Sequence, residues 1–168
     1  MIDFQHDILP LKNQLYRLAL RITLDTAEAE DIVQETLIKV WNLRDDWAKI
    51  DNIQAFCFTV CRNMALDSIK RGGSNNASLD DAPVEQADNA NTPSQQTIEN
   101  DQVSIVRNIV NTLPEKQRSC IQLRDFEGKA YKDIAKILDI TEEQVKINIH
   151  RGRQTIKQRF ISMDNYHA

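Results

Sequence analysis

Residues 72–96 carry the feature that most constrains the fold of this chain. The segment, GGSNNASLDDAPVEQADNANTPSQQ, is rich in Gly, Ser, Asn, Asp and Pro and holds almost no large apolar side chain. Such a composition buries too little surface to offset the entropy lost on ordering, so we expect a flexible linker. A chain of 168 residues divided in this way is expected to form two small domains.

Apolar residues on both sides of this segment recur at spacings of three and four. Gly and Pro number only 4 each, and no strand-like alternation competes, so an all-α protein is predicted. The first helix should cover about residues 5–23, with these residues inward: Leu11, Leu15, Leu18 and Ile22. A later helix over about 53–71 should pack on a stripe formed by Ile53, Phe56, Val60 and Met64, with Cys57 and Cys61 beside it.

The stretch AEDIVQETLIKVW, residues 29–41, predicts an amphipathic helix that begins near Thr26. Asp25 suits its N-cap, with Glu28 three residues on as a capping box. One side is predicted to be core and carries Ile32, Val33, Leu37, Val40 and Trp41. The other side carries Asp31, Gln34, Glu35 and Ile38, so an isoleucine lies among polar residues. This side is either a docking face or a solvated surface with one stray apolar residue.

The net charge of -4 hides an uneven distribution. Residues 72–106 contain six acidic residues and no Lys or Arg. The rest of the chain contains 21 basic and 19 acidic residues. The segment 144–160 is basic and contains no acid. A local basic surface attracts phosphate whatever a distant acidic segment does, so nucleic acid remains a possible partner.

The second half of the chain predicts a helix-turn-helix. A helix is expected over about 97–111, and a short one from Pro114 to about Arg124. In YKDIAKILDITEEQVKINIHRGRQTIKQRF, residues 131–160, Ile134 and Leu138 pack the first helix, and Ala135 is small where the second helix approaches. Residues 139–141 form the turn, and a capping box of Thr141 and Gln144 starts the recognition helix at Glu142.

The faces of the recognition helix follow from its periodicity. Its predicted inner face comprises Val145, Ile149, Ile156 and Phe160. Its outer face comprises Glu143, Ile147, Gln154 and Gln158, flanked by Lys146, His150 and Arg151. These side chains suit a DNA major groove: the long polar ones can contact base edges, the isoleucine can contact a thymine methyl, and the cations can contact phosphates. The alternative is a basic helix solvated on one side. Gly152 is expected to weaken the helix by about 1 kcal/mol relative to Ala.

Several classes of protein are disfavoured by the sequence. Cys57, Cys61 and Cys120 lie in apolar segments without a CxxC pair, which is typical of reduced core residues in a cytoplasmic protein. The histidines are distant from them in sequence, so neither a zinc site nor a cysteine-histidine nucleophile is expected. No apolar run reaches the roughly 20 residues of a membrane span, and no export signal is apparent.

By these motifs the chain resembles the extracytoplasmic-function sigma factors of bacterial RNA polymerase. The polymerase-binding segment of their region 2 is similar to AEDIVQETLIKVWN (29–42). The adjoining helix, which melts the promoter and recognises the minus-10 element, is similar to AFCFTVCRNMALDSIKR (55–71). Region 4, which reads the minus-35 element, is similar to residues 113–153. The resemblance implies region 2 in residues 1–71, the linker in 72–96 and region 4 in 97–168.

The resemblance also implies a role for each surface. Asp31, Gln34, Glu35 and Ile38 would dock on the clamp helices of the largest polymerase subunit. The loop 44–52 would capture a base flipped out of the non-template strand. The residues implied to contact minus-10 DNA are Trp47, Lys49, Asn52, Arg62, Asn63, Lys70 and Arg71. Those implied to contact minus-35 DNA are Lys132, Gln144, Lys146, Ile147, His150 and Arg151.

A binding mechanism follows, with no catalytic residue, cofactor or metal. The implied partners are core RNA polymerase, promoter DNA and an anti-sigma factor, often membrane-bound in this family. Phe56 stands where the family commonly has Trp, and Ile147 and Asn148 stand where it commonly has Ser and Arg, so no relative's promoter sequence can be carried over. Two rival readings stay open: a dimeric helix-turn-helix repressor and an enzyme with a cysteine nucleophile.

Overall fold

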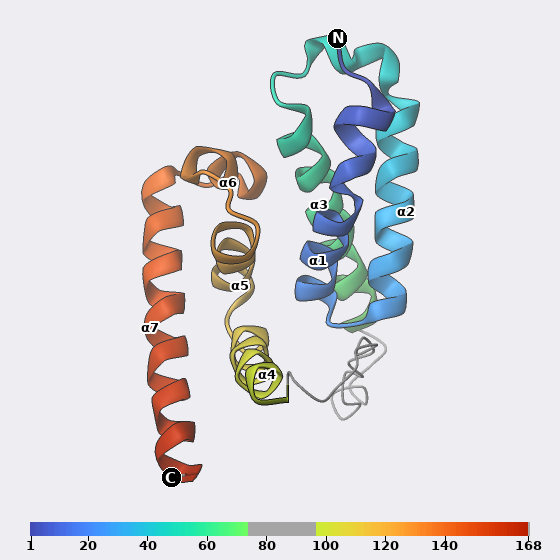
Figure 1. Ribbon diagram of the computed structural model, residues 1–168. Helices are drawn as coiled ribbons and strands as arrows, with labels where there is room; N and C mark the ends of the chain where they lie inside the picture. Colours follow the sequence, from blue (N-terminus) through green and yellow to red (C-terminus); the bar gives the residue numbers. More distant parts are fainter. Residues whose placement is uncertain (74–96, 168) are drawn as a thin grey trace.

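Three helices form the N-terminal lobe of the molecule. The computed structural model describes residues 1–73 and 97–167. After a π-helical turn (Phe4–Ile8) and a 3-10 turn (Leu9–Leu11), α1 (Lys12–Thr23), α2 (Thr26–Asn42) and α3 (Ile53–Gly73) pack side by side (Figure 1). A 3-10 turn, Arg44–Lys49, connects α2 to α3. The prediction of an all-α chain is confirmed, because the described residues contain helices and turns and no strand.

The tight turn between α1 and α2 shows how the sequence directs this lobe. Leu24 ends α1 in the left-handed conformation, with φ of 58°. The Asp25 carboxylate then accepts the Glu28 N–H at 3.1 Å, so the predicted N-cap of α2 is confirmed. The residues predicted to face inward from the first helix are all buried: Leu11, in the 3-10 turn before α1, and Leu15, Leu18 and Ile22.

The predicted core stripe of α3 was only partly right. Ile53, Phe56 and Met64 are half-buried and Val60 is buried. Cys57 and Cys61, predicted to lie beside this stripe, are among the most deeply buried side chains of α3, together with Phe58 and Ala65, which lie farther round the helix. The periodicity indicated one face, but α3 is covered on two, because a helix from the second lobe packs against it.

The C-terminal lobe contains α4 (Thr97–Asn111), α5 (Glu115–Ile121), a π-helical turn (Gln122–Phe126), α6 (Tyr131–Leu138) and α7 (Glu142–His167). The helix predicted over 97–111 has these bounds, and α5 begins directly after Pro114. The predicted linker, apart from its first two residues, lies outside the described part of the chain.

The helix-turn-helix is confirmed in its details. Asp139 adopts the left-handed conformation, with φ of 58°, which Asp tolerates better than most residues. The Thr141 hydroxyl accepts the Gln144 N–H, and the Gln144 side chain accepts the Thr141 N–H, both at 3.0 Å. This reciprocal capping box starts α7 at Glu142.

Gly152 allows α7 to approach α5 closely. A Cβ atom at this position would lie 3.0 Å from Ile121 Cγ1 and 3.2 Å from Ile121 Cδ1. The intrinsic cost of Gly within a helix is therefore offset by packing that a larger residue would disturb. The sequence alone indicated only the cost.

The two lobes pack against each other rather than standing apart. α5 and the turn after it contact α1, and α6 contacts α3. In Figure 1 α5 and α6 lie between the N-terminal bundle and the long α7. Residues of both lobes belong to one continuous set of packed apolar side chains. The arrangement has direct consequences for the candidate binding residues on α3.

Candidate functional site

The outer face of α2 presents its four candidate docking residues to solvent. Asp31, Gln34 and Glu35 are exposed, and the Ile38 side chain is 60% exposed. On the opposite side Ile32, Val33 and Val40 are buried, as predicted, and Leu37 is half-buried. A large apolar side chain that stays in water beside two carboxylates is a feature of surfaces that become buried in a complex.

Trp41 corrects one part of the prediction for α2. It was assigned to the core, but it is 44% exposed. Its ring packs edge to face against Phe4, with centroids 5.2 Å apart, and the Arg44 guanidinium lies 4.5 Å from its centroid. The position is three residues from Ile38, so Trp41 extends the exposed apolar surface of α2 by one turn.

The segment between α2 and α3 contains three candidate DNA residues in three different settings. Trp47 is buried, and its indole N–H donates to the Val40 carbonyl at 3.0 Å. Its ring stacks on Phe4, so in this conformation Trp47 supports the turn from inside and has no surface for DNA. Lys49 is exposed and lies 3.5 Å from Asp46. Asn52 is half-buried; its side chain accepts from the Ala55 N–H and donates to Asp133 of the C-terminal lobe at 3.2 Å.

The four candidate DNA residues of α3 are also placed differently. Asn63, Lys70 and Arg71 are exposed. Arg62 is only 7% exposed, and its guanidinium donates to both carboxylate oxygens of Glu115, at 2.7 and 3.2 Å. The structure therefore withholds Arg62 from solvent by pairing it with the first residue of α5.

The recognition helix presents its candidate residues outward. Gln144, Lys146, His150 and Arg151 are exposed, Ile147 is 43% exposed, and Lys132 on α6 is exposed as well. Val145 and Ile149 are buried on the inner face, whereas Ile156 and Phe160 are half-buried. The helix thus offers an exposed row of amide, basic and apolar side chains, which are the side-chain types that contact bases and phosphates in a major groove.

Two arginines of α1 form contacts that the sequence analysis did not identify. Arg17 donates to both oxygens of Glu127 at 2.7 Å, and this carboxylate also accepts from Gln122. Hydrogen bonding to Glu127 raises the pKa of Arg17, so the pair stays ionised. The sequence did offer one signal for these contacts, since Arg17 and Arg21 lie one helical turn apart beside the apolar stripe of α1.

Arg21 is the more unusual of the two, because it is buried without a carboxylate partner in direct contact. It donates to Gln122 at 2.8 Å and to Asn111 at 2.9 Å. Burial, followed by the nearby charges of Arg107 and Arg118, lowers the pKa of Arg21 to about 10. Amide oxygens from two segments of the C-terminal lobe therefore replace the water around this cation.

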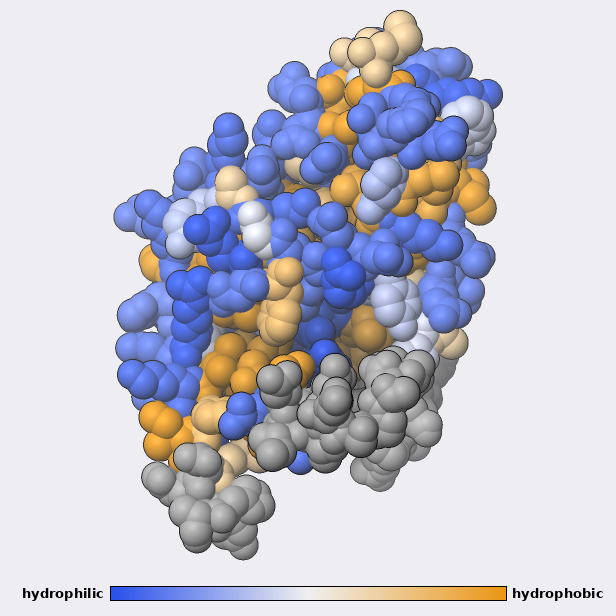
Figure 2. Space-filling view, in the orientation of Figure 1, coloured by the Kyte–Doolittle hydropathy of each residue, from blue (hydrophilic) through white to orange (hydrophobic). Residues whose placement is uncertain are grey.

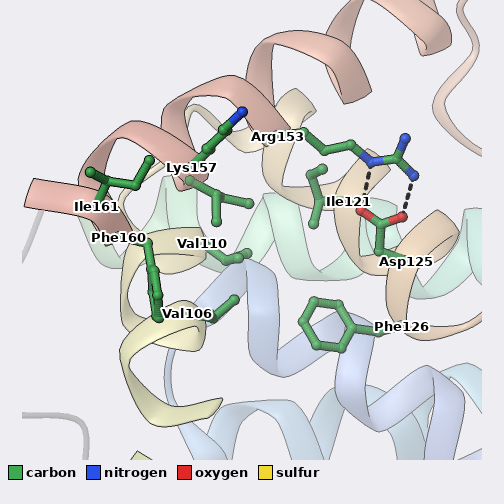
Figure 3. A pocket seen from close by; sticks show the side chains of 10 residues that line it. Val106, Val110, Ile121, Asp125, Phe126, Arg153, Lys157, Phe160 and Ile161 are labelled. Atoms are coloured by element: carbon green, nitrogen blue, oxygen red, sulfur yellow. Dashed lines mark hydrogen bonds and ion pairs between the residues drawn. The ribbon is translucent and has the colours of Figure 1, made fainter. Parts of the chain in front are cut away.

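An apolar groove opens between α4, α5 and α7. Its volume is about 380 Å³, and it is lined by Val106, Val110, Ile121, Phe126, Ile156, Phe160 and Ile161, with Asp125, Arg153 and Lys157 among them (Figure 3). Arg153 pairs with both oxygens of Asp125 at one edge. Figure 2 shows a largely hydrophilic face on which hydrophobic residues gather where α4 and the lower part of α7 lie in Figure 1.

The cysteines have the properties of core residues. Cys57, Cys61 and Cys120 are buried, and burial raises the pKa of each thiol to about 12. Such thiols are poor nucleophiles and poor metal ligands at neutral pH. Over residues 1–73 and 97–167, His, Cys, Asp and Glu side chains form no group of three that could hold a metal ion. None of the helices described is both long enough and apolar enough to span a bilayer.

Comparison with known families divides the chain as the two lobes do. The family described as "Sigma-70 region 2" matches residues 8–74, and that described as "Sigma-70, region 4" matches residues 104–156. The chain is 34% identical over 150 residues to "ECF RNA polymerase sigma factor SigL" of Mycobacterium tuberculosis, which covers 85% of this chain and 80% of the relative. It is 28% identical over 160 residues to "RNA polymerase sigma-H factor" of Pseudomonas aeruginosa, covering 89% and 83%.

Solved structures share the arrangement of both lobes. The sigma factor RpoE of Bartonella quintana, solved in complex with the anti-sigma factor NepR, superposes with a TM-score of 0.74 at 26% identity, over 96% of this chain and 98% of that one. CnrH, solved with the cytosolic domain of CnrY, shows the same fold at 17% identity, with a TM-score of 0.67 over 92% and 85% of the two chains. The chain belongs to the extracytoplasmic-function sigma factors, which direct bacterial RNA polymerase to promoters for transcription initiation.

Proposed function

We propose that α2 is the element by which this sigma factor holds core RNA polymerase. The docking face consists of Asp31, Gln34, Glu35 and Ile38, and its proposed target is the clamp helices of the largest subunit. The observation that carries the assignment is Ile38, which is 60% exposed among exposed polar residues. Carboxylates would supply electrostatic complementarity to a basic surface, and the isoleucine would supply buried apolar area.

Promoter recognition is proposed to be divided between the lobes. Residues 1–71 would act on the minus-10 element, with Lys49, Asn52, Arg62, Asn63, Lys70 and Arg71 as DNA contacts. Residues 97–168 would read the minus-35 element through Lys132, Gln144, Lys146, Ile147, His150 and Arg151. Trp47 is retained only as support for the turn, because its indole is buried against Phe4 and Val40. A flipped base would be captured by the exposed part of the same turn.

The chain is proposed to act in the cytoplasm by binding alone, without a catalytic step. The raised pKa of the three buried cysteines supports this proposal, since none is suited to act as a nucleophile. The structures of RpoE with NepR and of CnrH with CnrY motivate a further proposal. An anti-sigma factor would also restrain this chain by covering the surfaces that bind polymerase and DNA.

The direct test of the docking face is equilibrium binding of the purified chain to bacterial core RNA polymerase. The variant Glu35→Lys, Ile38→Asp reverses one charge and removes the exposed apolar side chain. We expect tight binding by the wild type and a loss of at least tenfold in the variant, since a charge placed against an apolar contact is costly.

A matched control lies on α3. Asp67→Lys, Ile69→Asp makes the same two chemical changes at an exposed carboxylate and at an isoleucine that is 40% exposed. It should bind polymerase as the wild type does. Equal loss in both folded variants would show a general effect of charge and would contradict the assignment of α2. No binding by the folded wild type would contradict the proposed partner.

A further inference from the structure

Three aromatic rings meet where the turn Arg44–Lys49 follows the end of α2. Phe4 lies edge to face with Trp41, with centroids 5.2 Å apart, and parallel to Trp47, with centroids 6.5 Å apart and an interplanar angle of 7°. Trp41 and Trp47 also meet edge to face, with centroids 6.2 Å apart. All three separations are favourable for aromatic rings. The cluster therefore joins three segments of the N-terminal lobe: the segment before α1, the end of α2 and the turn.

Trp47 holds this turn to the rest of the lobe. Within Arg44–Lys49 it is the buried residue, and the others are exposed. Its indole N–H donates to the Val40 carbonyl at 3.0 Å, which leaves the faces of the ring to be held by packing. Leu43, at the N-cap of the turn, has no side-chain oxygen that could accept a hydrogen bond. The position of the turn therefore depends on what packs against Trp47.

The segment that carries Phe4 is itself fixed by hydrogen bonds and burial. The Asp3 carboxylate accepts the Gln5 N–H at 3.3 Å, and the Asp7 carboxylate accepts the Asp3 N–H at 2.8 Å. The Asp7 N–H in turn donates to the Asp3 carbonyl at 2.8 Å. At the end of this π-helical turn, Ile8 is fully buried. These restraints present the half-buried ring of Phe4 in one orientation.

The turn is a part of the molecule in which precise placement matters. In the proposed function its exposed part captures a flipped base, with Lys49 among the candidate contacts. Groups in a binding site must be held within about 0.5 Å of the productive geometry by neighbours that are themselves fixed. Phe4 can supply this support without touching DNA, because it contacts α2 through Trp41 and the turn through Trp47. Polymerase that holds α2 would thereby also hold the turn.

We infer that Phe4 is a positioning residue for promoter recognition: its ring fixes the turn Arg44–Lys49 against α2 in the orientation that captures a flipped base of the minus-10 element. The inference rests on the proposed role of this turn. It gives the segment before α1 a part in reading DNA through the turn that it supports. Phe4 should affect how well the minus-10 bases are distinguished, and it should leave polymerase binding and minus-35 recognition unchanged.

The first test measures the packing of Trp47 in the free, full-length protein. Trp41 and Trp47 are the 2 tryptophans of the chain, so Trp41→Phe keeps a ring at position 41 and leaves Trp47 as the sole indole. Adding Phe4→Ala to this parent should raise the acrylamide quenching constant of Trp47 at least twofold and shift its emission to longer wavelength. Phe4→Tyr keeps the ring and should restore the values of the parent.

The matched control is Leu20→Ala in the same parent. Leu20 is a half-buried apolar residue of the N-terminal lobe, near the end of α1 that leads into α2, whereas Trp41 lies at the far end of α2. Its truncation removes packing from the lobe and should leave the quenching of Trp47 unchanged. Unchanged quenching in the folded Phe4→Ala variant would overturn the inference. So would an equal rise in the control, because Phe4 would then not be what holds Trp47.

The second test measures base discrimination during initiation. Promoters are located by mapping transcript 5′ ends on genomic DNA with wild-type holoenzyme. The strongest is then copied with the most harmful single change in its minus-10 or its minus-35 element. For each protein, the initiation rate on the original promoter is divided by the rate on each altered one. With Phe4→Ala the minus-10 ratio should fall at least threefold while the minus-35 ratio stays constant, and Phe4→Tyr should restore the minus-10 ratio.

Ratios of rates separate positioning from a merely structural role. A variant that only lowered the fraction of folded protein would reduce all rates equally and leave both ratios unchanged. That result would overturn the inference, and so would loss of core polymerase binding by folded Phe4→Ala. If the wild type initiates while Phe4→Ala keeps the minus-10 ratio, the inference alone is wrong. If the folded wild type neither binds polymerase nor initiates, the proposed function is wrong and the inference falls with it.

Discussion

α2 and α3 lie side by side in one lobe, yet they present their candidate binding residues in opposite ways. Ile38 on α2 is 60% exposed, whereas Arg62 on α3 is 7% exposed. Both helices carry one apolar face toward α1, so this face does not explain the difference. The second lobe packs on α3 and supplies Glu115 and Asp133 to its polar side chains. What covers a helix from outside decides which of its residues can act.

The largest expected effect is a difference between substitutions on the two helices in the free energy of unfolding. Phe58→Ala on α3 should lower the free energy of unfolding by about 3–5 kcal/mol, since the side chain is fully buried and its loss leaves a cavity. Ile38→Ala on α2 should change it by about 0.5 kcal/mol or less, because that side chain is already in water. Urea unfolding of both variants measures the contrast. Similar losses of stability at the two positions would contradict the burial of Phe58 and the exposure of Ile38.

A smaller effect is expected from the ion pair of Arg17 and Glu127, which joins α1 to the C-terminal lobe. Glu127→Ala should lower the free energy of unfolding by about 1–3 kcal/mol, because the loss leaves Gln122 and Arg17 without their acceptor. Glu35→Ala on the exposed face of α2 should have an effect near zero. Thermal unfolding of both proteins at one ionic strength compares them. If Glu127→Ala left the stability unchanged, the ion pair of Arg17 and Glu127 would add nothing to the contact between the lobes.

The caps of the two helices should also behave differently. Asp25→Ala removes the cap of α2, and Asn52→Ala removes that of α3, each at a cost of about 1 kcal/mol. The Asn52 side chain also donates a hydrogen bond to Asp133 of the other lobe, whereas the Asp25 carboxylate accepts a local hydrogen bond from the Glu28 N–H. A double-mutant cycle with Asp133→Ala should therefore show coupling to Asn52 and none to Asp25. Coupling to both, or to neither, would contradict the assigned contacts.

The smallest effect on stability at neutral pH is expected from the ionisation of the buried thiols. Cysteine introduced in place of Glu35 on α2 should be alkylated quickly at pH 8, while Cys57 and Cys61 on α3 should react only on unfolding. Burial raises the pKa of both native thiols to about 12. The unfolded thiol loses its proton first, so stability should fall as pH rises from about 9 toward 12. Fast labelling of the native thiols in folded protein would contradict their burial.

Local features of the fold could be predicted from the sequence because their causes are local. The capping box of Thr141 and Gln144, the left-handed turn at Asp139 and the cap at Asp25 each involve residues within four positions. The exposed row on α2 followed from helical periodicity for the same reason. These features correctly predicted which side chains of α2 are exposed and where α7 begins.

Features that depend on the second lobe could not be predicted in this way. Glu115 lies 53 positions from Arg62, and Glu127 lies 110 positions from Arg17, so no periodicity connects them. The burial of Trp47 depends on Phe4, which belongs to a turn before the first helix. The sequence indicated only that Gly152 weakens its helix; the close approach of Ile121, which requires a residue without a Cβ atom there, depends on the packing of α5 against α7. Long-range packing converted an assigned DNA residue into half of an ion pair.

Transcription reconstituted from purified core polymerase tests most directly whether this chain directs RNA polymerase to promoters. Genomic DNA is the template, and transcript 5′ ends are mapped with and without the chain. We predict new, discrete start sites that share upstream minus-35 and minus-10 sequences and that are lost with Glu35→Lys, Ile38→Asp. Start sites unchanged by the folded, polymerase-binding wild type would contradict the account.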